Sequence, residues 1–327
     1  MTAAALRPDS ETVMTAGDAA GDAAGDAAAG AAAVLQAFGR QRAAVDGALA
    51  GFCDRYLAAI PPLTADAIRY ALMGEGKRMR PMLVLAAYEA AGGRGDATRL
   101  AAAVEVVHAY SLVHDDLPCM DDDDVRRGRP TVHRVYGVPA ATAAGLAMVP
   151  LAARCALDAA AELGLAPDAC GRVVRELMRA SGAGGMIGGQ QLDLEGEGMS
   201  HSLEQLQRIH RAKTGALITA AARIGGVAAG ADAGRLAALG HYGEAVGLAF
   251  QIADDVLDVT ATTHELGKTA GRDLELHKST YPALLGVDGA MQRARALADE
   301  ARRALDAVGL LTPTLAYIAE FSVARRS

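Results

Sequence analysis

An acidic stretch joined directly to an apolar one most constrains what this chain can fold into. Six aspartates lie within residues 115–124, and Arg126 and Arg127 follow them. Residues 104–113, just before them, are mostly apolar, which predicts the end of a buried helix with the carboxylates at the mouth of a core. Closely spaced carboxylates repel one another unless a cation or solvent screens them. Because Mg²⁺ prefers carboxylate oxygens and arginine binds phosphate oxygens, the stretch favours a metal-bridged diphosphate, although a solvated acidic loop also carries such a run.

A second acidic cluster lies far along the chain, within residues 250–258. Asp254 and Asp258 are four residues apart, so on a helix they share one face. Their neighbours are apolar, which predicts a mostly buried helix with an acidic patch, and acids are seldom buried without a partner. The two clusters could therefore face each other across one cavity and hold several metal ions.

The composition predicts an all-helical protein. The 327 residues are 51% hydrophobic, with 4% aromatic residues, no tryptophan and many alanines, which favours closely packed helices over sheets. The net charge of −7 argues against nonspecific binding of nucleic acid by a basic surface. The four cysteines form no CxxC pair, so free thiols in a reducing cytoplasm fit better than disulfides or a zinc site. Cys119, inside the acidic stretch, is interpreted as a small filler because no partner base is evident.

The N-terminal segment, residues 1–33, is of low complexity and repeats Gly-Asp-Ala-Ala. It lacks the apolar block needed to pack, so we predict a disordered tail followed by one folded domain over residues 34–327. The tail has no basic start or apolar core like a signal peptide, and it is too acidic for a usual transit peptide, which agrees with a cytoplasmic location.

Residues 135–153 are uncharged and close to a membrane span in length. Their Ala, Gly, Thr and Pro content is only weakly apolar. We therefore predict a buried core helix or a pair of helices here, and no membrane span.

Three cations follow a glycine-rich turn in the first half of the chain. Lys77, Arg78 and Arg80 come after Gly74-Glu-Gly76 and lead into an apolar helix. The positive end of a helix start helps to bind an anion, so these residues are candidates for a phosphate site. A basic surface turn explains them equally well.

His108 lies seven residues before Asp115, so the two side chains project from nearly the same helical face. A lone histidine on such a face is usually a core residue, but this alignment favours a role in the cavity. The glycine-rich residues 181–189 fail the dinucleotide-binding spacing and follow no strand pattern, so they predict a close helix crossing. For Lys268, Arg272 and Lys278, which follow the second acidic cluster, solvated loop charge and phosphate contact both stay open.

Seven short motifs in one order carry a resemblance to a known family. They are GKRMRP (76–81), DDLPCMD (115–121), RRG (126–128), GGQQLDL (188–194), KTG (213–215), FQIADDVLD (250–258) and GKTAGRD (267–273). The chain resembles the trans-type isoprenyl (polyprenyl) diphosphate synthases, and most closely their bacterial short-chain branch, over residues 34–327. The resemblance implies an all-α, isoprenoid-synthase-type helical bundle around a deep central cavity, usually as a homodimer.

The resemblance also implies the chemistry. Mg²⁺, with Mn²⁺ as a substitute, would bind an allylic diphosphate to the two aspartate motifs, and isopentenyl diphosphate would attack the allylic cation that forms when the diphosphate leaves. By motif, the catalytic residues are Asp115, Asp116, Asp121, Asp254, Asp255, Asp258, Lys213 and Lys268, with Asp115, Asp121 and Asp254 as metal ligands. The allylic diphosphate would be held by Arg126, Lys213, Thr214, Gln251 and Lys268, and isopentenyl diphosphate by Lys77, Arg80, His108 and Arg127.

Product length follows from the same resemblance. In this family the residue five before the first aspartate motif helps to form the cavity floor, and here it is Tyr110, followed by Ser111. A bulky ring there should stop growth early, so we predict farnesyl diphosphate (C15). Geranylgeranyl diphosphate (C20) is the alternative, because the Pro-Cys insertion at residues 118–119 occurs in both types of synthase.

The chain departs from the family pattern at two positions. Leu146 replaces an aspartate that relatives commonly have, and Glu75 replaces a glycine. These departures leave a catalytically weak subunit of a larger assembly as an alternative. A terpene cyclase is less favoured, since cyclases usually replace the second aspartate motif and lack the GKRxRP element. A plain helical scaffold would leave unexplained why acids and cations lie at the ends of apolar helices.

Overall fold

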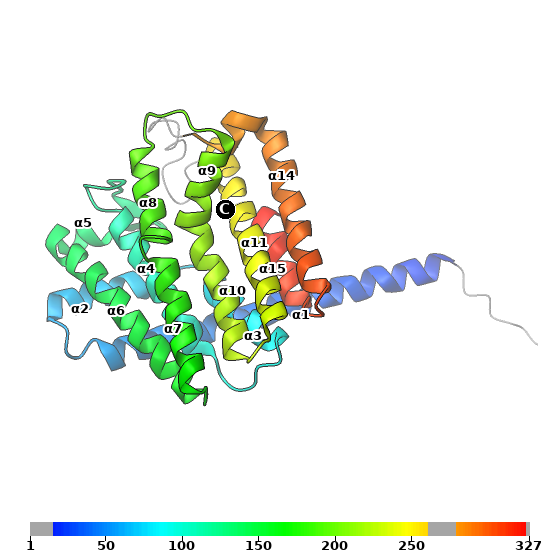
Figure 1. Cartoon of the computed structure of the whole chain (residues 1–327), viewed down its shortest axis with the longest axis horizontal. Helices are drawn as coiled ribbons and strands as arrows, with labels where there is room; N and C mark the ends of the chain where they lie inside the picture. Colours follow the sequence, from blue (N-terminus) through cyan, green and yellow to red (C-terminus); the bar gives the residue numbers. More distant parts are fainter. Residues whose placement is uncertain (1–15, 261–278, 325–327) are drawn as a thin grey trace, which may run out of the picture.

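The computed structural model describes residues 16–260 and 279–324, with side chains from residue 32 onward, and it is built almost entirely of helices (Figure 1). In chain order these are α1 (Ala16–Tyr56), α2 (Pro62–Leu72), α3 (Met79–Ala90), α4 (Thr98–Asp115), α5 (Val132–Tyr136), α6 (Val138–Glu162), α7 (Pro167–Ser181), α8 (Met186–Glu195), α9 (Leu203–His210), the π-helix η1 (Arg211–Gly215), α10 (Ala216–Ala228), α11 (Ala233–Thr260), α14 (Tyr281–Asp306) and α15 (Pro313–Ala324). A two-residue hairpin, β1 (Val125–Arg126) with β2 (Arg129–Pro130), is antiparallel, and Val125 pairs with Pro130. The all-α prediction is confirmed.

Helix starts follow local sequence chemistry. Pro62 opens α2, where its missing N–H costs no hydrogen bond. Ser202 and Gln205 form a capping box at the start of α9. The hydroxyl of Thr280 accepts a hydrogen bond from the backbone N–H of Ala283 (3.3 Å) and caps α14. Helices α9 and α14 both pack against α11, which carries the second aspartate motif.

The N-terminal segment is described from residue 16 onward, and the predicted disorder of the tail stays a prediction. Helix α1 begins at Ala16, so the backbone of residues 16–33 is helical. Alanine has the highest helix propensity of all residues, which favours this extension although the segment has few apolar side chains to pack. Residues 1–15 lie outside the described residues, and the domain boundary near residue 34 stays a prediction.

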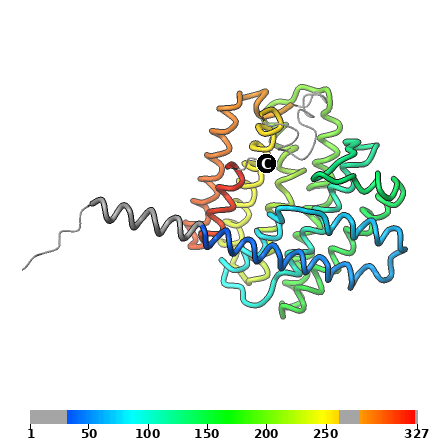
Figure 2. Tube along the Cα trace, turned by 180° about the vertical axis from the view of Figure 1, so that it is seen from behind, coloured from blue at the N-terminus to red at the C-terminus, as the bar shows by residue number. Residues whose placement is uncertain are grey.

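The core lies where α3, α4, α10 and α11 pack together, with α6 and α7 on one side and α14 and α15 on the other (Figures 1 and 2). Figure 2 shows α1 crossing the base of this group. Glycines let α11 approach its neighbours closely: a Cβ on Gly243 would lie 2.6 Å from Cα of Thr219, and one on Gly247 would lie 2.9 Å from Cα of Gly215. Helix α11, which carries the second aspartate motif, is thereby held against η1 and α10.

Helix α6 covers the uncharged residues 138–153. Within the described part of the chain it is the one helix that is long and apolar enough to cross a membrane by length and composition, with 44% of the tested window buried. It packs against α2, α4, α5 and α7. Core helices of soluble proteins satisfy the same criterion, so the finding is compatible with the predicted buried core helix or pair of helices over residues 135–153.

Candidate active site

The first aspartate motif forms a turn at the end of α4 that is held by backbone hydrogen bonds. Asp115 is the last residue of α4, and its carbonyl oxygen accepts a hydrogen bond from the backbone N–H of Asp121 (2.8 Å). Asp122 has a left-handed backbone (φ 48°), and its N–H donates to the carbonyl oxygen of Leu117 (3.1 Å). This turn brings Asp121 back beside Asp115, where each carboxylate feels the charge of the other.

Asp116, by contrast, supports Arg126. Arg126 donates to one oxygen of Asp116 through Nε (2.8 Å) and Nη2 (2.6 Å), and its Nη2 also donates to Asp123 (2.9 Å). Burial raises the pKa of Asp116 to about 6, and the neighbouring guanidinium of Arg126 acts in the opposite direction. Asp116 therefore orients a cation in this structure, and a direct catalytic role for Asp116 stays a prediction.

Lys213 joins the first aspartate motif to α8. Its ammonium group, in η1, donates to Oδ2 of Asp193 on α8 (2.6 Å). Burial alone would lower the pKa of Lys213, but the carboxylates of Asp193, Asp115 and Asp121 outweigh burial and raise it. Burial raises the pKa of Asp115 to about 7, and the charge of Lys213 counters that rise. Lys213 is thus a permanent cation between two acidic groups.

The glycine-rich residues 181–189 allow α8 to approach η1 closely. A Cβ on Gly189 would lie 2.1 Å from the backbone nitrogen of Lys213, so only glycine allows α8 to pack directly on η1. The expected close helix crossing is confirmed at this position. The wider π-helical turn of η1 contains the whole KTG motif, and such turns are frequent at functional sites.

A chain of hydrogen bonds links the second aspartate motif to η1. The hydroxyl of Thr214 donates to Gln251 (2.8 Å), and the amide of Gln251 donates to Oδ1 of Asp255 (3.1 Å). The other oxygen of Asp255 accepts the backbone N–H of Tyr281 at the start of α14 (3.0 Å). Buried Asp255 therefore ties α11 to α14 and orients Gln251, and its Oδ1 also lies 3.9 Å from Nε2 of His210. A direct catalytic role for Asp255 stays a prediction.

His210, the last residue of α9, lies between the two aspartate motifs. Burial lowers its pKa to about 4, and the charges of Asp193, Lys213 and Asp254 also act on it. Its ring stacks on Tyr281 with the centroids 5.7 Å apart. Asp254 and the Lys213–Asp193 pair are therefore neighbours of one histidine. Lys213 in turn lies near Asp115 and Asp121, so His210 and Lys213 link the two aspartate motifs. That the motifs face each other across one cavity stays a prediction.

A cluster of arginines surrounds His108 on α4. Burial lowers the pKa of His108 well below its usual value, and the charges of Arg80, Arg127, Arg78 and Arg126 lower it further. The Nη2 atom of Arg127 lies 3.4 Å from Nε2 of His108. The structure thus brings together three of the residues predicted to hold isopentenyl diphosphate, Arg80, His108 and Arg127. We call these four arginines and His108 the arginine cluster.

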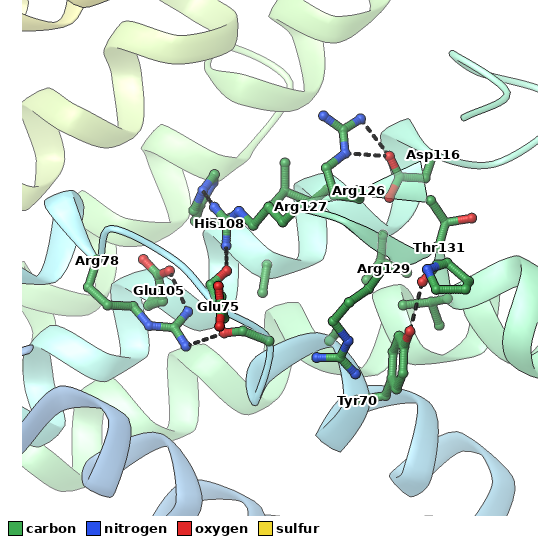
Figure 3. Close-up of a pocket in the computed structure, with 17 residues that line it drawn as sticks. Tyr70, Glu75, Arg78, Glu105, His108, Asp116, Arg126, Arg127, Arg129 and Thr131 are labelled. Atoms are coloured by element: carbon green, nitrogen blue, oxygen red, sulfur yellow. Dashed lines mark hydrogen bonds and ion pairs between the residues drawn. The ribbon is translucent and has the colours of Figure 1, made fainter. Parts of the chain in front are cut away.

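A cavity adjoins the arginine cluster. Figure 3 shows Arg127 beside His108, with the Arg126–Asp116 pair on one side and Arg78 with Glu105 on the other. The cavity lies between α2, α4 and the β1–β2 hairpin. A positive pocket of this kind suits a phosphate group.

Two of the three cations in the GKRMRP motif, Lys77 and Arg78, are not placed as equivalent anion ligands. The ammonium of Lys77 lies 5.7 Å from the ring centroid of Phe321 on α15, beside a second cavity lined by residues of α1 and α15. Arg78 is buried and donates to Glu105 (3.0 Å). Arg78 therefore faces the interior, and the interpretation of it as an anion ligand is wrong.

The predicted floor residues lie one turn before the first aspartate motif. Tyr110 is buried and makes an edge-on ring contact with His114, with the centroids 4.8 Å apart. The hydroxyl of Ser111 donates to the carbonyl oxygen of His108 (2.9 Å). His114 itself packs over Gly145 of α6, where a Cβ would lie 1.9 Å from its Nε2. The ring of Tyr110 is therefore backed by another helix.

The donors fit a magnesium site chemically, because Asp115 and Asp121 offer adjacent carboxylates whose mutual repulsion a cation would relieve. Among the side chains that the structure describes, in residues 32–260 and 279–324, no three His, Cys, Asp or Glu side chains converge closely enough to hold a metal ion by themselves. Asp258 is buried on α11. Lys268 lies outside the described residues. The assignment of Asp115, Asp121 and Asp254 as metal ligands stays a prediction.

Comparisons with known proteins agree with this site. The profile of a family described as Polyprenyl synthetase matches residues 61–310. The chain is 45% identical to the farnesyl diphosphate synthase of Escherichia coli over 285 residues, which cover 83% of this chain and 93% of that protein. It is 44% identical to the chloroplastic geranylgeranyl pyrophosphate synthase 9 of Arabidopsis thaliana over 271 residues, covering 81% of this chain and 74% of that protein. A crystal structure of a Helicobacter pylori geranyltransferase complexed with magnesium and isoprenyl diphosphate superposes with a TM-score of 0.74 at 31% identity, covering 88% and 96% of the two chains.

The fold and these matches define an all-α prenyltransferase of isoprenoid biosynthesis. The chain belongs to the polyprenyl synthetase family, and it is a short-chain prenyl diphosphate synthase.

The structure adds two residues to which the sequence analysis gave no role. Asp193 pairs with Lys213, and His210 lies between the motifs. Asp193 stands inside the quoted GGQQLDL motif, so its place beside other recognised motifs could have marked it. His210 carries no such sign, because it lies three positions before Lys213 and outside every quoted motif.

Proposed function

We propose that this enzyme condenses isopentenyl diphosphate with dimethylallyl and then geranyl diphosphate, with Mg²⁺, to give farnesyl diphosphate. The observation that carries the proposal is the position of Lys213. Asp115 and Asp121 of the first motif act on it, and it lies with Asp254 of the second motif among the groups that act on His210. The arginine cluster lies at the first motif, because Arg126 belongs to it and donates to Asp116. Acidic groups for a metal-bound diphosphate thus lie beside cations for a second one. The similarity to the farnesyl diphosphate synthase of Escherichia coli supports the substrate class.

On the allylic side, Lys213 and Arg126 would bind the diphosphate together with Thr214, Gln251 and Lys268. When bound, magnesium held by Asp115, Asp121 and Asp254, with Asp116 and Asp258 in support, would supply positive charge that stabilises the departing diphosphate. The carbon–oxygen bond breaks, the diphosphate leaves with the electron pair, and an allylic cation remains. Lys213 suits this step because it remains charged among Asp193, Asp115 and Asp121.

On the other side, Arg80, His108, Arg127 and Lys77 would hold isopentenyl diphosphate. His108 is neutral at pH 7, so the positive charge here comes from the arginines. The terminal alkene carbon attacks the allylic cation and forms the new carbon–carbon bond. The product carbocation then loses a proton, which the released diphosphate accepts.

The product length rests on Tyr110. Its buried ring, backed by His114 and α6, supports an early stop to chain growth and hence a C15 product. A C20 product is the second candidate, favoured by the nearly equal identity to the geranylgeranyl pyrophosphate synthase of Arabidopsis thaliana.

The test is product analysis. Purified protein is incubated with Mg²⁺, isopentenyl diphosphate and each of the C5, C10 and C15 allylic diphosphates, and the hydrolysed prenols are sized. We expect farnesol from the C5 and C10 starters and no use of the C15 starter. Geranylgeraniol as the product would be consistent with the family, but it would refute the argument that the ring of Tyr110 limits the product to C15. A chain that condenses none of the starters would refute the proposed activity and favour a weak subunit or a cyclase.

We also propose a homodimer in the cytoplasm. Helix α6 presents exposed apolar side chains along one side, among them Leu146 (67% exposed), Leu157 (46%) and Val138 (41%). Leu146 stands where relatives commonly have aspartate, and a second copy of the chain would cover it. We expect Leu146→Glu to weaken the dimer, as sedimentation velocity would show. An unchanged dimer would place the interface elsewhere, and a monomeric wild type would refute the proposal.

A further inference from the structure

Arg78 differs from the other members of the arginine cluster, because its guanidinium faces the protein interior and is 5% exposed. It donates to the carboxylates of Asp46 on α1 (2.8 Å) and Glu105 on α4 (3.0 Å). It also donates to the carbonyl oxygens of Leu72 (3.1 Å) and Gly74 (2.8 Å). Two carboxylates balance its charge and its nitrogens are occupied, so Arg78 does not serve as a phosphate ligand.

These bonds determine the shape of the loop between α2 and α3. Leu72 ends α2, and Gly74 lies within the loop. The hydrogen bonds of Arg78 therefore hold the segment that contains Lys77 and leads into Arg80. The backbone of Arg78 is left-handed (φ 50°, ψ 33°), a conformation that is unfavourable for a residue with a side chain. The side-chain hydrogen bonds stabilise this conformation.

The other side of the same loop supports Arg127. The carbonyl oxygen of Glu75 accepts a hydrogen bond from Nη1 of Arg127 (2.9 Å), as Figure 3 shows. A Cβ on Gly76 would lie 2.7 Å from Nη1 of Arg127 and 3.1 Å from Nη1 of Arg78. The loop is therefore packed between the two guanidinium groups, and displacing it would displace Arg127.

Arg78 is also attached to the helix that carries His108. Glu105 is buried on α4 and lies one turn before His108. A buried carboxylate requires a partner, and Arg78 supplies it. One side chain thus connects α1, α4 and the α2–α3 loop behind the arginine cluster.

We propose that Arg78 is a positioning residue for the isopentenyl diphosphate site, and this rests on the proposed function. Its hydrogen bonds set the loop that presents Lys77 and Arg80 and supports Arg127. The allylic site is built from different contacts, namely Lys213 with Asp193 and Thr214 with Gln251. Loss of the Arg78 contacts should therefore affect one diphosphate site and spare the other.

The first variant is Arg78→Lys, which keeps the charge but cannot reach all four acceptors from a single ammonium. Steady-state kinetics measure the KM for isopentenyl diphosphate and the KM for geranyl diphosphate separately. We expect the first to rise about tenfold or more, because small displacements of binding groups have large kinetic effects. The KM for geranyl diphosphate should stay within about twofold of wild type.

The matched control is Arg223→Lys. Arg223 on α10 also donates twice to a carboxylate, that of Glu176 on α7 (2.9 and 2.8 Å), and once to the carbonyl oxygen of Leu236 (3.3 Å). It lies away from both diphosphate sites. Arg223→Lys should lower the melting temperature without changing either KM, which separates positioning from general stability.

A double variant, Arg78→Met with Glu105→Met, covers the case in which the single variant does not fold. It removes the buried cation and its buried partner together, which proteins often tolerate. We expect the same selective rise in the KM for isopentenyl diphosphate. An unchanged KM, or an equal rise in both KM values, in a folded variant would overturn the proposal. If the wild type condensed nothing, the proposed function would fail, and calorimetric binding of isopentenyl diphosphate to wild type and variants would then decide the role of Arg78.

Discussion

The two neighbouring aspartates of the second motif should respond differently to the same substitution. Asp255 is 3% exposed and accepts hydrogen bonds from the Gln251 side chain (3.1 Å) and the Tyr281 backbone (3.0 Å). Asp254, one position earlier, lies among the groups that act on His210. We predict that Asp255→Asn lowers stability without changing the magnesium requirement, whereas Asp254→Asn raises the magnesium concentration needed for half-maximal activity.

The size of the stability loss follows from the contacts of Asp255. Asparagine keeps the shape of the side chain, but its amide nitrogen must then face one of the two donors, Gln251 or Tyr281. One hydrogen bond to a charged acceptor is lost and a buried donor is left unsatisfied, which together cost about 2–3 kcal/mol. Because the unfolding entropy grows with chain length, this corresponds to a fall in Tm of about 3–5 °C for a protein of this size.

The assay combines two measurements on each variant. Differential scanning calorimetry gives Tm, and activity against magnesium concentration gives the half-saturating value. Asp254→Asn is the control, with a Tm near that of wild type. If Asp255→Asn kept the wild-type Tm and raised the magnesium requirement as much as Asp254→Asn does, Asp255 would belong to the metal site and the hydrogen-bond argument would be refuted.

Three further changes test other parts of the structure. Gly189→Ala should destabilise the protein by about 1–3 kcal/mol, because the new Cβ would lie 2.1 Å from the backbone nitrogen of Lys213. Gly171→Ala, with nothing within 4 Å of the added Cβ, is its control, and equal urea midpoints for the two variants would contradict the packing argument. The hydrogen bond from Arg223 lowers the pKa of Glu176 below its ordinary value of 4.5, so this pair stabilises the protein above pH 4.5 and the contribution is lost as pH falls through the lowered pKa. The stability difference between wild type and Glu176→Gln, measured by urea unfolding, should therefore shrink below pH 4.5, and a difference that grew there would refute the assignment. Deletion of residues 1–33 should leave kcat within about twofold of wild type, and a large loss would show that the segment contributes to the active domain.

The elements that the sequence predicts well are those set by local patterns. The run of apolar residues before Asp115 predicts α4, and the spacing of Asp254 and Asp258 predicts that both lie on one helix. Both expectations are confirmed, because the hydrophobic face of a helix is determined by its own residues. The glycines of residues 181–189 also follow this rule, since closely packed backbones leave no room for a Cβ.

The direction of individual side chains within a motif is not set locally. Asp254 and Asp255 have the same chemistry and adjacent positions, yet Asp255 turns toward Gln251 and the start of α14. That direction depends on α14, which follows more than twenty residues later, and no periodicity of α11 contains it. A motif therefore identifies the group of acids that serve the site without showing which one binds and which one supports.

Arg78 shows how such a case could be recognised in advance. Glu105 is a single acid within the apolar residues 100–107, and its burial demands a cationic partner. That requirement can be recognised from the sequence, and it predicts that one cation elsewhere in the chain is buried inside the protein as the partner of Glu105. The sequence does not show which of Lys77, Arg78 and Arg80 it is, because the left-handed backbone that turns Arg78 inward is stabilised by contacts with α1 and α4. When an apolar helix contains one isolated acid, one nearby cation should therefore be assigned to that acid as its buried partner and not to the ligand.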